Sequence, residues 1–210
     1  MSRILAISDI HGHVEGVKIL LEMAKYNPKS DKLFLLGDFI DRRPFTWSSI
    51  EYIIELTEKG AEAIVGNTDY FYRKKKNADK NKQSLLRSTI KFIESLPLYI
   101  EHENFLFVHA GIRPGIALHK QTLKDLTEIR EPFWKTPYPF SKFVVFGHTP
   151  TEKMGAKPGE IWVGPGMLGI DTGAKHDYRL TLVNLTEHIS YSISTNPKHL
   201  YKDLRISHFK

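Results

Sequence analysis

The N-terminal part of the chain alternates short apolar runs with segments of helical periodicity, and this alternation limits the folds open to it. The apolar runs span residues 3–8, 32–36 and 61–65, and their length and composition are typical of buried strands. Between them, residues 14–26 and 46–60 place apolar side chains on one helical face. Strand and helix signals in this order predict parallel strands with helices packed against the sheet.

The rest of the chain continues with helical and then strand-like segments. A lysine-rich piece near 70–82 and a helix over 84–96, stopped by Pro97, precede a second half made mostly of short apolar runs. Residues 178–195 alternate apolar and polar side chains, which predicts an antiparallel hairpin. We therefore expect an α/β fold with a mixed second sheet, in one domain over residues 1–210.

Composition excludes several kinds of chemistry. The chain has no cysteine, which excludes disulfides, thiol nucleophiles and cysteine-bound zinc, and it has ten histidines as possible ligands. The net charge of +6 favours anionic partners, phosphates included. No apolar stretch is long enough to span a bilayer, and no apolar leader precedes the first strand, so we expect a cytoplasmic protein.

Polar side chains with metal-binding chemistry follow the expected strands. In an open α/β sheet, ligands bind beyond the carboxyl ends of the strands, so these side chains are expected at one edge. Each short polar segment alone would be an ordinary turn or cap, but together and in this order they predict a metal site. A mixed set of nitrogen and oxygen ligands suits Mn, Fe or Zn, and six ligands fit two ions that share a carboxylate better than one tetrahedral ion. The six are Asp9, His11, Asp38, Asn67, His109 and His148.

The polar segments resemble the motifs of the phosphoprotein phosphatases within the calcineurin-like metallophosphoesterases. The resemblance covers essentially the whole chain, and two of the segments are similar to the small bacterial and phage branch of that family. It implies a sandwich of mixed β-sheets flanked by helices. The segments are SDIHG (8–12), GDFIDRR (37–43), GNTD (66–69), HAG (109–111), GHTP (147–150), IREPFW (129–134) and IDTG (170–173).

The resemblance also implies how the ligands are divided. By position, Asp9 and His11 would hold a first ion and Asp38 would bridge it to a second, which Asn67, His109 and His148 would complete. We expect two divalent ions, manganese first, with iron, zinc or nickel as alternatives. A hydroxide held by the metals would attack phosphorus in line while metals and arginines hold the equatorial oxygens.

The same resemblance assigns roles outside the metal ligands. Arg42 and Arg130 match the family arginines that grip the phosphate, and Asp41 matches the carboxylate that orients the general-acid histidine. His13 and Asp171 are expected to support the ligands from outside.

The chain departs from the family pattern at three positions. Ser8 and Arg43 replace glycines, which affects loop shape and removes no ligand. Thr68 stands where the family has its acid histidine. A threonine hydroxyl can hydrogen-bond to Asp41 or to the leaving group, but it is no general acid near neutral pH, so a rate loss of roughly 10²–10⁴-fold is expected for poor leaving groups. His176 is an alternative proton source, although an exposed loop histidine is the simpler interpretation.

These observations leave three functions open. The first is a phosphatase acting on phosphorylated proteins, at serine, threonine or tyrosine. The alternative is a symmetrical diadenosine tetraphosphatase, and the third is a degenerate binder of phosphorylated partners. The basic segment 73–82 carries six cations, and we interpret it as a solvated surface rather than a nucleic-acid site, since it has no interleaved aromatic residues. The expected partner is thus a phosphorylated protein or a nucleotide, with no membrane.

Overall fold

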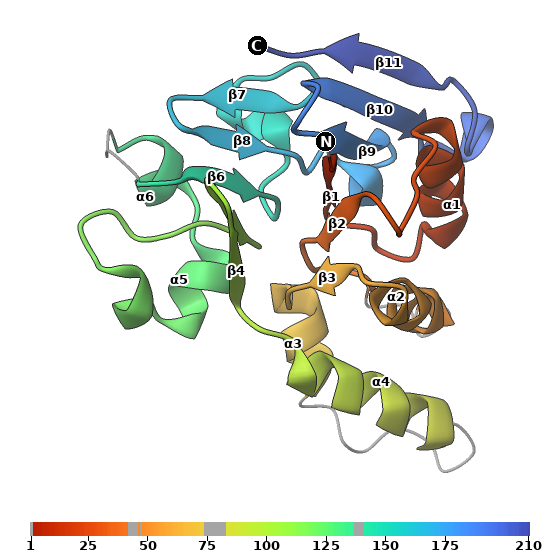
Figure 1. The fold of residues 1–210 in the computed structure, drawn as a ribbon, viewed down its shortest axis with the longest axis horizontal. Coiled ribbons are helices and arrows are strands. Elements are labelled where there is room, and N and C mark those ends of the chain that lie inside the picture. The colour runs from red at the N-terminus through yellow and green to blue at the C-terminus, as the bar shows by residue number, and fades with distance from the viewer. Residues whose placement is uncertain (1, 42–45, 47, 74–82, 137–140) are drawn as a thin grey trace.

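The computed structural model describes residues 2–41, 46, 48–73, 83–136 and 141–210. Within these residues the strands form a six-stranded and a five-stranded sheet (Figure 1). In spatial order the first sheet contains β11 (Arg205–His208), β10 (Ile189–Ser194), β9 (Arg179–Asn184), β1 (Ile4–Ile7), β2 (Lys32–Leu35) and β3 (Glu62–Ala63). The second contains β4 (Tyr99–His102), β5 (Phe105–Val108), β6 (Phe143–Phe146), β8 (Met167–Gly169) and β7 (Trp162–Gly164).

Strands β1, β2 and β3 pair in parallel, as the alternating pattern predicts. Leu5 of β1 lies opposite Leu33 of β2 on one side and opposite Asn184 of β9 on the other. The β9–β10 hairpin predicted for residues 178–195 is confirmed as antiparallel. The hairpin joins the first sheet next to β1, which makes that sheet mixed. The second sheet is mixed too, because β5, β6 and β8 are parallel and its two outer strands are antiparallel to their neighbours.

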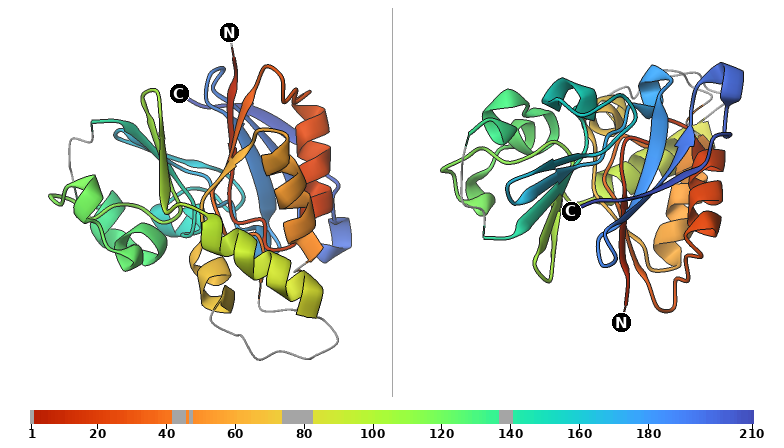
Figure 2. Two further views of the ribbon diagram at one scale, coloured as in Figure 1. Left: turned by 60° about the horizontal axis from the view of Figure 1, so that its bottom comes forward. Right: turned by 90° about the horizontal axis from the view of Figure 1, so that it is seen from above.

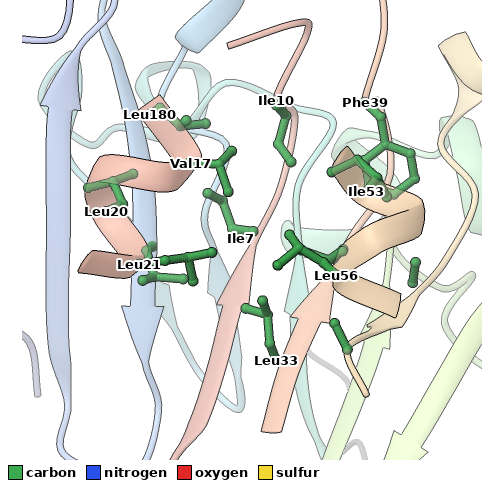
Figure 3. Packing of buried hydrophobic residues seen from close by; sticks show 14 of the residues in the cluster. Ile7, Ile10, Val17, Leu20, Leu21, Leu33, Phe39, Ile53, Leu56 and Leu180 are labelled. Carbon is green, nitrogen blue, oxygen red and sulfur yellow. The ribbon is translucent and has the colours of Figure 1, made fainter. Parts of the chain in front are cut away.

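The helices form where the apolar periodicity places them. In α1, Val17, Leu20 and Leu21 are buried against the first sheet (Figure 3). Ser48 holds the N-cap position of α2 without a side-chain cap hydrogen bond. The α-helices are α1 (Val14–Met23), α2 (Ser49–Glu58), α3 (Asn67–Arg73), α4 (Gln83–Ser95), α5 (Leu123–Glu128) and α6 (Glu131–Trp134). The 3₁₀ helices are η3 (Leu118–Lys120), η4 (Thr151–Met154), η5 (Ala174–His176) and η6 (Pro197–His199).

Three apolar clusters divide the molecule into layers, with α1 and α2 on one side of the sheets and α5 and α6 on the other (Figure 2). The middle cluster lies between the two sheets, where Phe34 of β2 stacks on Phe107 of β5 with ring centroids 4.0 Å apart. The expected sandwich of mixed sheets flanked by helices is therefore confirmed. Among the described residues, no helix combines the length and apolar character needed to cross a membrane.

Candidate active site

The loops that follow β1 and β2 bring the first three expected ligands together. Backbone hydrogen bonds extend the pairing of these strands into the loops, from Asp9 N–H to the Gly37 carbonyl (3.1 Å) and from His11 N–H to the Asp38 carbonyl (2.9 Å). The side chains of Asp9, His11 and Asp38 are buried, and their candidate ligand atoms lie within 4.8 Å of one another. Such a group of two carboxylates and an imidazole can hold a metal ion.

Four of the six expected ligands have left-handed backbone conformations that non-glycine residues seldom adopt. Their φ angles are 51° at Asp9, 45° at His11, 53° at Asp38 and 65° at His148. Each such residue costs of order 1–3 kcal/mol and persists only where the surrounding structure imposes it. The fold thus turns the chain sharply at each of these strand ends, and the strain coincides with the ligand set.

Two histidines are fixed by hydrogen bonds to carbonyl groups. Nδ1 of His11 lies 3.1 Å from the Ile40 carbonyl oxygen, and Nδ1 of His109 lies 2.7 Å from the Leu36 carbonyl oxygen. Because a carbonyl only accepts, Nδ1 carries the proton in both rings, and Nε2 of the neutral ring presents a lone pair. In metal-ligating histidines, too, the ring nitrogen that does not bind the metal donates its proton to a carbonyl or carboxylate oxygen.

Around His109 the ligand atoms are all acceptors. Its Nε2 atom lies 3.1 Å from Oδ1 of Asn67 and 3.5 Å from Oδ1 of Asp38. In the neutral ring with Nδ1 protonated, none of these three atoms has a proton to share with the others. A cation between them satisfies all three, so the expected second group of ligands fits a metal ion.

The two oxygens of Asp38 face different histidines. Oδ1 faces His109, and Oδ2 lies 3.7 Å from Nε2 of His11. One carboxylate is therefore positioned between the two ligand groups, which is the placement that a bridging ligand requires.

His148 comes from the second sheet, after β6. Its backbone N–H donates to Oδ2 of Asp9 (2.8 Å), and its ring is packed edge to face on His109 with centroids 5.2 Å apart. Burial lowers the pKa of His148 to about 3, with further contributions from the His109 ring when it is protonated and from the charge of Arg130, so the His148 ring is neutral. Its buried Nε2 has no hydrogen-bond partner among the described residues. A neutral, unpartnered imidazole at this place fits a metal ligand.

Two glycines allow the ligand loops to approach each other. A Cβ atom on Gly66 would lie 2.2 Å from the backbone nitrogen of Asp38, and one on Gly147 would lie 2.2 Å from Oδ2 of Asp9. Each position therefore requires glycine, because a side chain would displace an expected ligand. The N–H of Gly147 donates to the carbonyl of His109 at 2.7 Å, which extends the pairing of β5 and β6 into the two loops.

Buried carboxylates dominate the electrostatics of the site. Burial disfavours the charged ring of His11, but the carboxylates of Asp9 and Asp38, each 3.7 Å from Nε2, outweigh it and raise the pKa of His11 to about 9. Burial and the charge of Asp9 raise the pKa of Asp171 to about 8. The protein therefore holds protons at a site with excess negative charge, where a divalent ion would replace them.

Thr68 makes a contact that sequence reasoning did not anticipate. Its hydroxyl donates to Oδ2 of Asp38 (2.6 Å), and its backbone N–H donates to Oδ1 of the same residue (2.8 Å). The expected partner, Asp41, instead has its carboxylate next to the hydroxyl of Thr46, at 3.3 Å. Thr68 thus supports the expected bridging carboxylate.

The remaining expected residues divide into three groups. Arg130 lies at the start of α6, with Nη1 3.4 Å from the hydroxyl of Thr149, and it lines the same pocket as five of the six expected metal ligands. Asp171 lines that pocket too, whereas His13 contacts the hydroxyl of Tyr201 at 3.1 Å. Arg42, Arg43 and positions 74–82 of the basic segment lie outside the described residues.

The pocket has a volume of about 250 Å³ and is bordered by loops from both sheets. Expected metal ligands and cationic side chains both line it, which suits an anion held beside metal ions. Its lining residues are Asp9, His11, Asp38, Asn67, Thr68, Arg130, His148, Pro150, Lys153, Asp171, Lys175 and His176.

Two supporting residues were missed by sequence reasoning. Asp69 is fully buried, and its carboxylate accepts from the N–H groups of Phe39 (3.0 Å) and Gly66 (3.2 Å), so it ties the loops after β2 and β3 together. Ser8 donates its hydroxyl to Oδ2 of Asp9. For Asp69 a signal existed, its place in the GNTD segment, but nothing in the sequence shows its buried partners.

Comparison with known proteins bears on this geometry. The profile of the calcineurin-like phosphoesterase family matches residues 2–174. The chain belongs to this family. It is therefore a metallophosphoesterase, as the motifs predicted, and members of the family use a centre of two metals. This assignment fits the ligand arrangement described above.

Curated proteins similar to this chain carry the name of a nucleotide hydrolase. A symmetrical bis(5'-nucleosyl)-tetraphosphatase from Vibrio cholerae is 26% identical over 144 residues, which cover 62% of this chain and 53% of that protein. The enzyme of the same name from Pseudomonas syringae is 30% identical over 139 residues, covering 60% and 47%. The chain thus spans about half the length of these curated relatives. A crystal structure of a candidate diadenosine tetraphosphatase has a TM-score of 0.74 and 20% identity, covering 92% of this chain and 93% of that one, and shows the shared fold.

Proposed function

We propose that the protein hydrolyses phosphoanhydride bonds of dinucleoside polyphosphates, at a site that holds two divalent ions with manganese as the first choice. The observation that carries the proposal is the cluster of His109, Asn67 and Asp38 beside the first ligand group. Asn67 and Asp38 of this cluster line one pocket with Arg130. The curated relatives carry the name of the alternative that the sequence left open rather than that of a protein phosphatase.

The chain's own groups suit the binding of a phosphate. When bound, the ions would supply positive charge to the phosphoryl oxygens and lower the pKa of a water molecule. Arg130 would hold equatorial oxygens with its planar guanidinium group. Asp38 would hold the two metal positions at a fixed separation, supported by both donors of Thr68. The expected role of Arg42 would add a second guanidinium group.

Thr68 favours a substrate with a good leaving group. An alkoxide that leaves from a serine phosphate needs a proton, and a threonine hydroxyl engaged with Asp38 does not provide one. A nucleoside diphosphate leaves through a phosphate oxygen, whose conjugate acid has a pKa near about 6, so it departs without protonation. The anhydride is the substrate class that this site would cleave without the histidine acid.

A substrate panel tests the proposal. Purified protein with added Mn²⁺ would receive diadenosine tetraphosphate, a phosphoserine peptide and a phosphotyrosine peptide, and Asp38→Asn would serve as the inactive control. We expect hydrolysis of the tetraphosphate to two nucleoside diphosphates at a kcat/KM at least about 100-fold above that of the phosphoserine peptide, the usual worth of general acid help. Faster release of phosphate from a peptide would favour a protein phosphatase, and binding without turnover would favour a degenerate binder.

A further inference from the structure

Two lysines line the pocket without a role in the mechanism described so far. Lys153 lies in η4, shortly after the ligand His148, and Lys175 lies in η5, shortly after Asp171. Both belong to the same pocket as Arg130 and the metal ligands. The pocket therefore has cationic groups in addition to the one arginine expected to hold the reacting phosphate.

The helices that carry these lysines are anchored to the site. Thr151 of η4 donates its N–H to the carbonyl of Asp171 (2.9 Å) and its hydroxyl to the carbonyl of Glu160 (2.6 Å). Just before η5, the N–H of Gly173 donates to Oδ1 of Asp171 (3.0 Å). Asp171 thus connects both segments, and the backbone positions of the lysines are set by the ligand loops.

Neither lysine is neutralised by the protein. Lys153 and Lys175 form no ion pair in the part of the chain that the structure describes, whereas the exposed Lys18 pairs with Glu15 at 2.6 Å. An unpaired cation that lines a pocket is available for an anionic ligand.

The cations of the pocket come from separate segments of the chain. Arg130 lies at the start of α6, Lys153 in η4 and Lys175 in η5. All three line the pocket together with Asp38. A ligand that contacts Arg130 and both lysines would therefore bind to three segments of the chain at once.

We propose that Lys153 and Lys175 form a second phosphate subsite, which binds the phosphate groups of a polyphosphate chain next to the group that reacts. The inference rests on the proposed function and names which part of the substrate this chain recognises. A pocket of about 250 Å³ lies below the roughly 300–1,000 Å³ of sites that enclose a drug-sized ligand. The pocket thus takes the phosphates, and the nucleosides lie outside it.

Binding measurements test the subsite apart from catalysis. The probes are adenosine 5'-(β,γ-methylene)triphosphate and inorganic orthophosphate, titrated calorimetrically into protein saturated with Mn²⁺. The variant is Lys153→Gln with Lys175→Gln. A control with the same loss of charge is Lys157→Gln with Lys198→Gln, because both of these lysines are exposed and neither is among the residues that line the pocket.

We expect the pocket variant to weaken binding of the methylene triphosphate roughly 10–100-fold and binding of orthophosphate less than about 3-fold, since two charge-assisted contacts are lost only with the longer anion. The control pair should change either affinity less than about 3-fold. If both double variants lost the same affinity for the methylene triphosphate, net charge alone would explain the effect, and the subsite would be overturned. Equal losses for both probes, or no binding of the triphosphate by the unaltered protein, would also overturn it.

The failure of the subsite and that of the proposed function give different results. If diadenosine tetraphosphate is not hydrolysed while the triphosphate still binds through the two lysines, the function is wrong and the subsite stands. If the tetraphosphate is hydrolysed with the same KM by the pocket variant and the unaltered protein, the function stands and the subsite is wrong.

Discussion

Thr68 commits its hydroxyl proton to Asp38, the carboxylate that faces both ligand groups. A hydroxyl held in this way orients the carboxylate, and its own proton is engaged away from a leaving group. Groups that hydrogen-bond to a metal ligand typically contribute about 10–100-fold in metal affinity. Thr68 is therefore a positioning residue. It stands where the family has an acid histidine, and it orients Asp38 instead of protonating a leaving group.

Thr68→Val tests this support, because valine keeps the branched shape and removes the hydroxyl. We expect the affinity for Mn²⁺ to fall about 10-fold, measured by calorimetric titration of metal-free protein. Thr68→Ser is the matched control, since serine retains the donor, and it should bind the metal almost as the unaltered protein does. Equal affinity of the valine and serine variants would contradict an orienting role.

Thr68→His should restore the missing acid. We expect kcat for an alkyl phosphate monoester to rise at least about 100-fold, whereas an aryl phosphate with an electron-withdrawing substituent should gain little. In the unaltered protein, the rate constant should depend steeply on the pKa of the leaving group. In the variant this dependence should become flat. Adding Asp41→Asn should make it steep again, because Asp41 would hold the new imidazole. No gain for alkyl esters would indicate another proton donor, with His176 as the first candidate.

At this scale the sequence predicts which side chains gather and not how they pair. Asp9, His11, Asp38 and His148 could be found because each follows an apolar run, and strand ends share an edge of the sheet. The bond from Thr68 to Asp38 could not, since it depends on the side-chain orientation of two residues thirty positions apart.

At the scale of elements, a brace joins the beginnings of β1 and β2 to the end of α1. Arg3 donates to both oxygens of Asp31, through Nε at 3.1 Å and Nη2 at 2.6 Å, and through Nη1 to the carbonyl of Ala24 at 2.8 Å. The N–H of Asn27 also donates to Asp31, at 2.8 Å. The brace fixes the crossover that places the loops after β1 and β2 next to each other.

Asp31→Asn should destabilise the protein in a pH-dependent way. Burial opposes ionisation of Asp31, but the hydrogen bonds from Arg3 and Asn27 lower its pKa. Its contribution is therefore present above the unfolded value near about 4 and is lost as pH falls through the lowered folded pKa. We expect a loss of about 1–2 kcal/mol in the free energy of unfolding at pH 7, since Arg3 is partly exposed.

Urea unfolding of metal-free protein at pH 7 and at progressively lower pH would measure this difference. The exposed Asp177→Asn is the control, because asparagine also tolerates the left-handed conformation there. A destabilisation by Asp31→Asn that stays constant down to pH 2 would contradict the ionic origin of the effect.

Elements with strong local patterns could be predicted, and their long-range pairing could not. Helix α1 and the parallel strands β1 to β3 follow from periodicity and alternation. The hairpin of β9 and β10 was also predictable, but its place beside β1 depends on contacts between distant parts of the chain. Local propensity contains no information about those contacts.

At the scale of the whole molecule, the expected ligands come from both sheets. Asp9, His11, Asp38 and Asn67 follow strands of the first sheet, whereas His109 and His148 follow strands of the second. An ion bound to both groups would connect the two sheets. Because such an ion binds the folded state alone, metal adds to the stability of the entire fold.

Removal of metal should therefore lower the melting temperature. An ion present at about 100 times its dissociation constant contributes about 2.7 kcal/mol, which for a chain of this size corresponds to roughly 5–10 °C. Calorimetric scans with Mn²⁺ and with excess chelator would measure the shift. Asp38→Asn should reduce it to less than half, because both ligand groups lose a shared carboxylate. A shift that is the same in both proteins would place the stabilising ion elsewhere.

The stacked rings of Phe34 and Phe107 connect the core between the sheets to the expected metal ligands that follow the same strands. Asp38 follows the strand that carries one ring, and His109 follows the strand that carries the other. Since protein interiors are close-packed, the separation of the sheets follows the volume of the side chains between them. The volume of the core would then set the distance between the expected metal positions. Two chains with the same ligands and different cores can therefore evolve different metal preferences and turnover rates without any change at the catalytic positions.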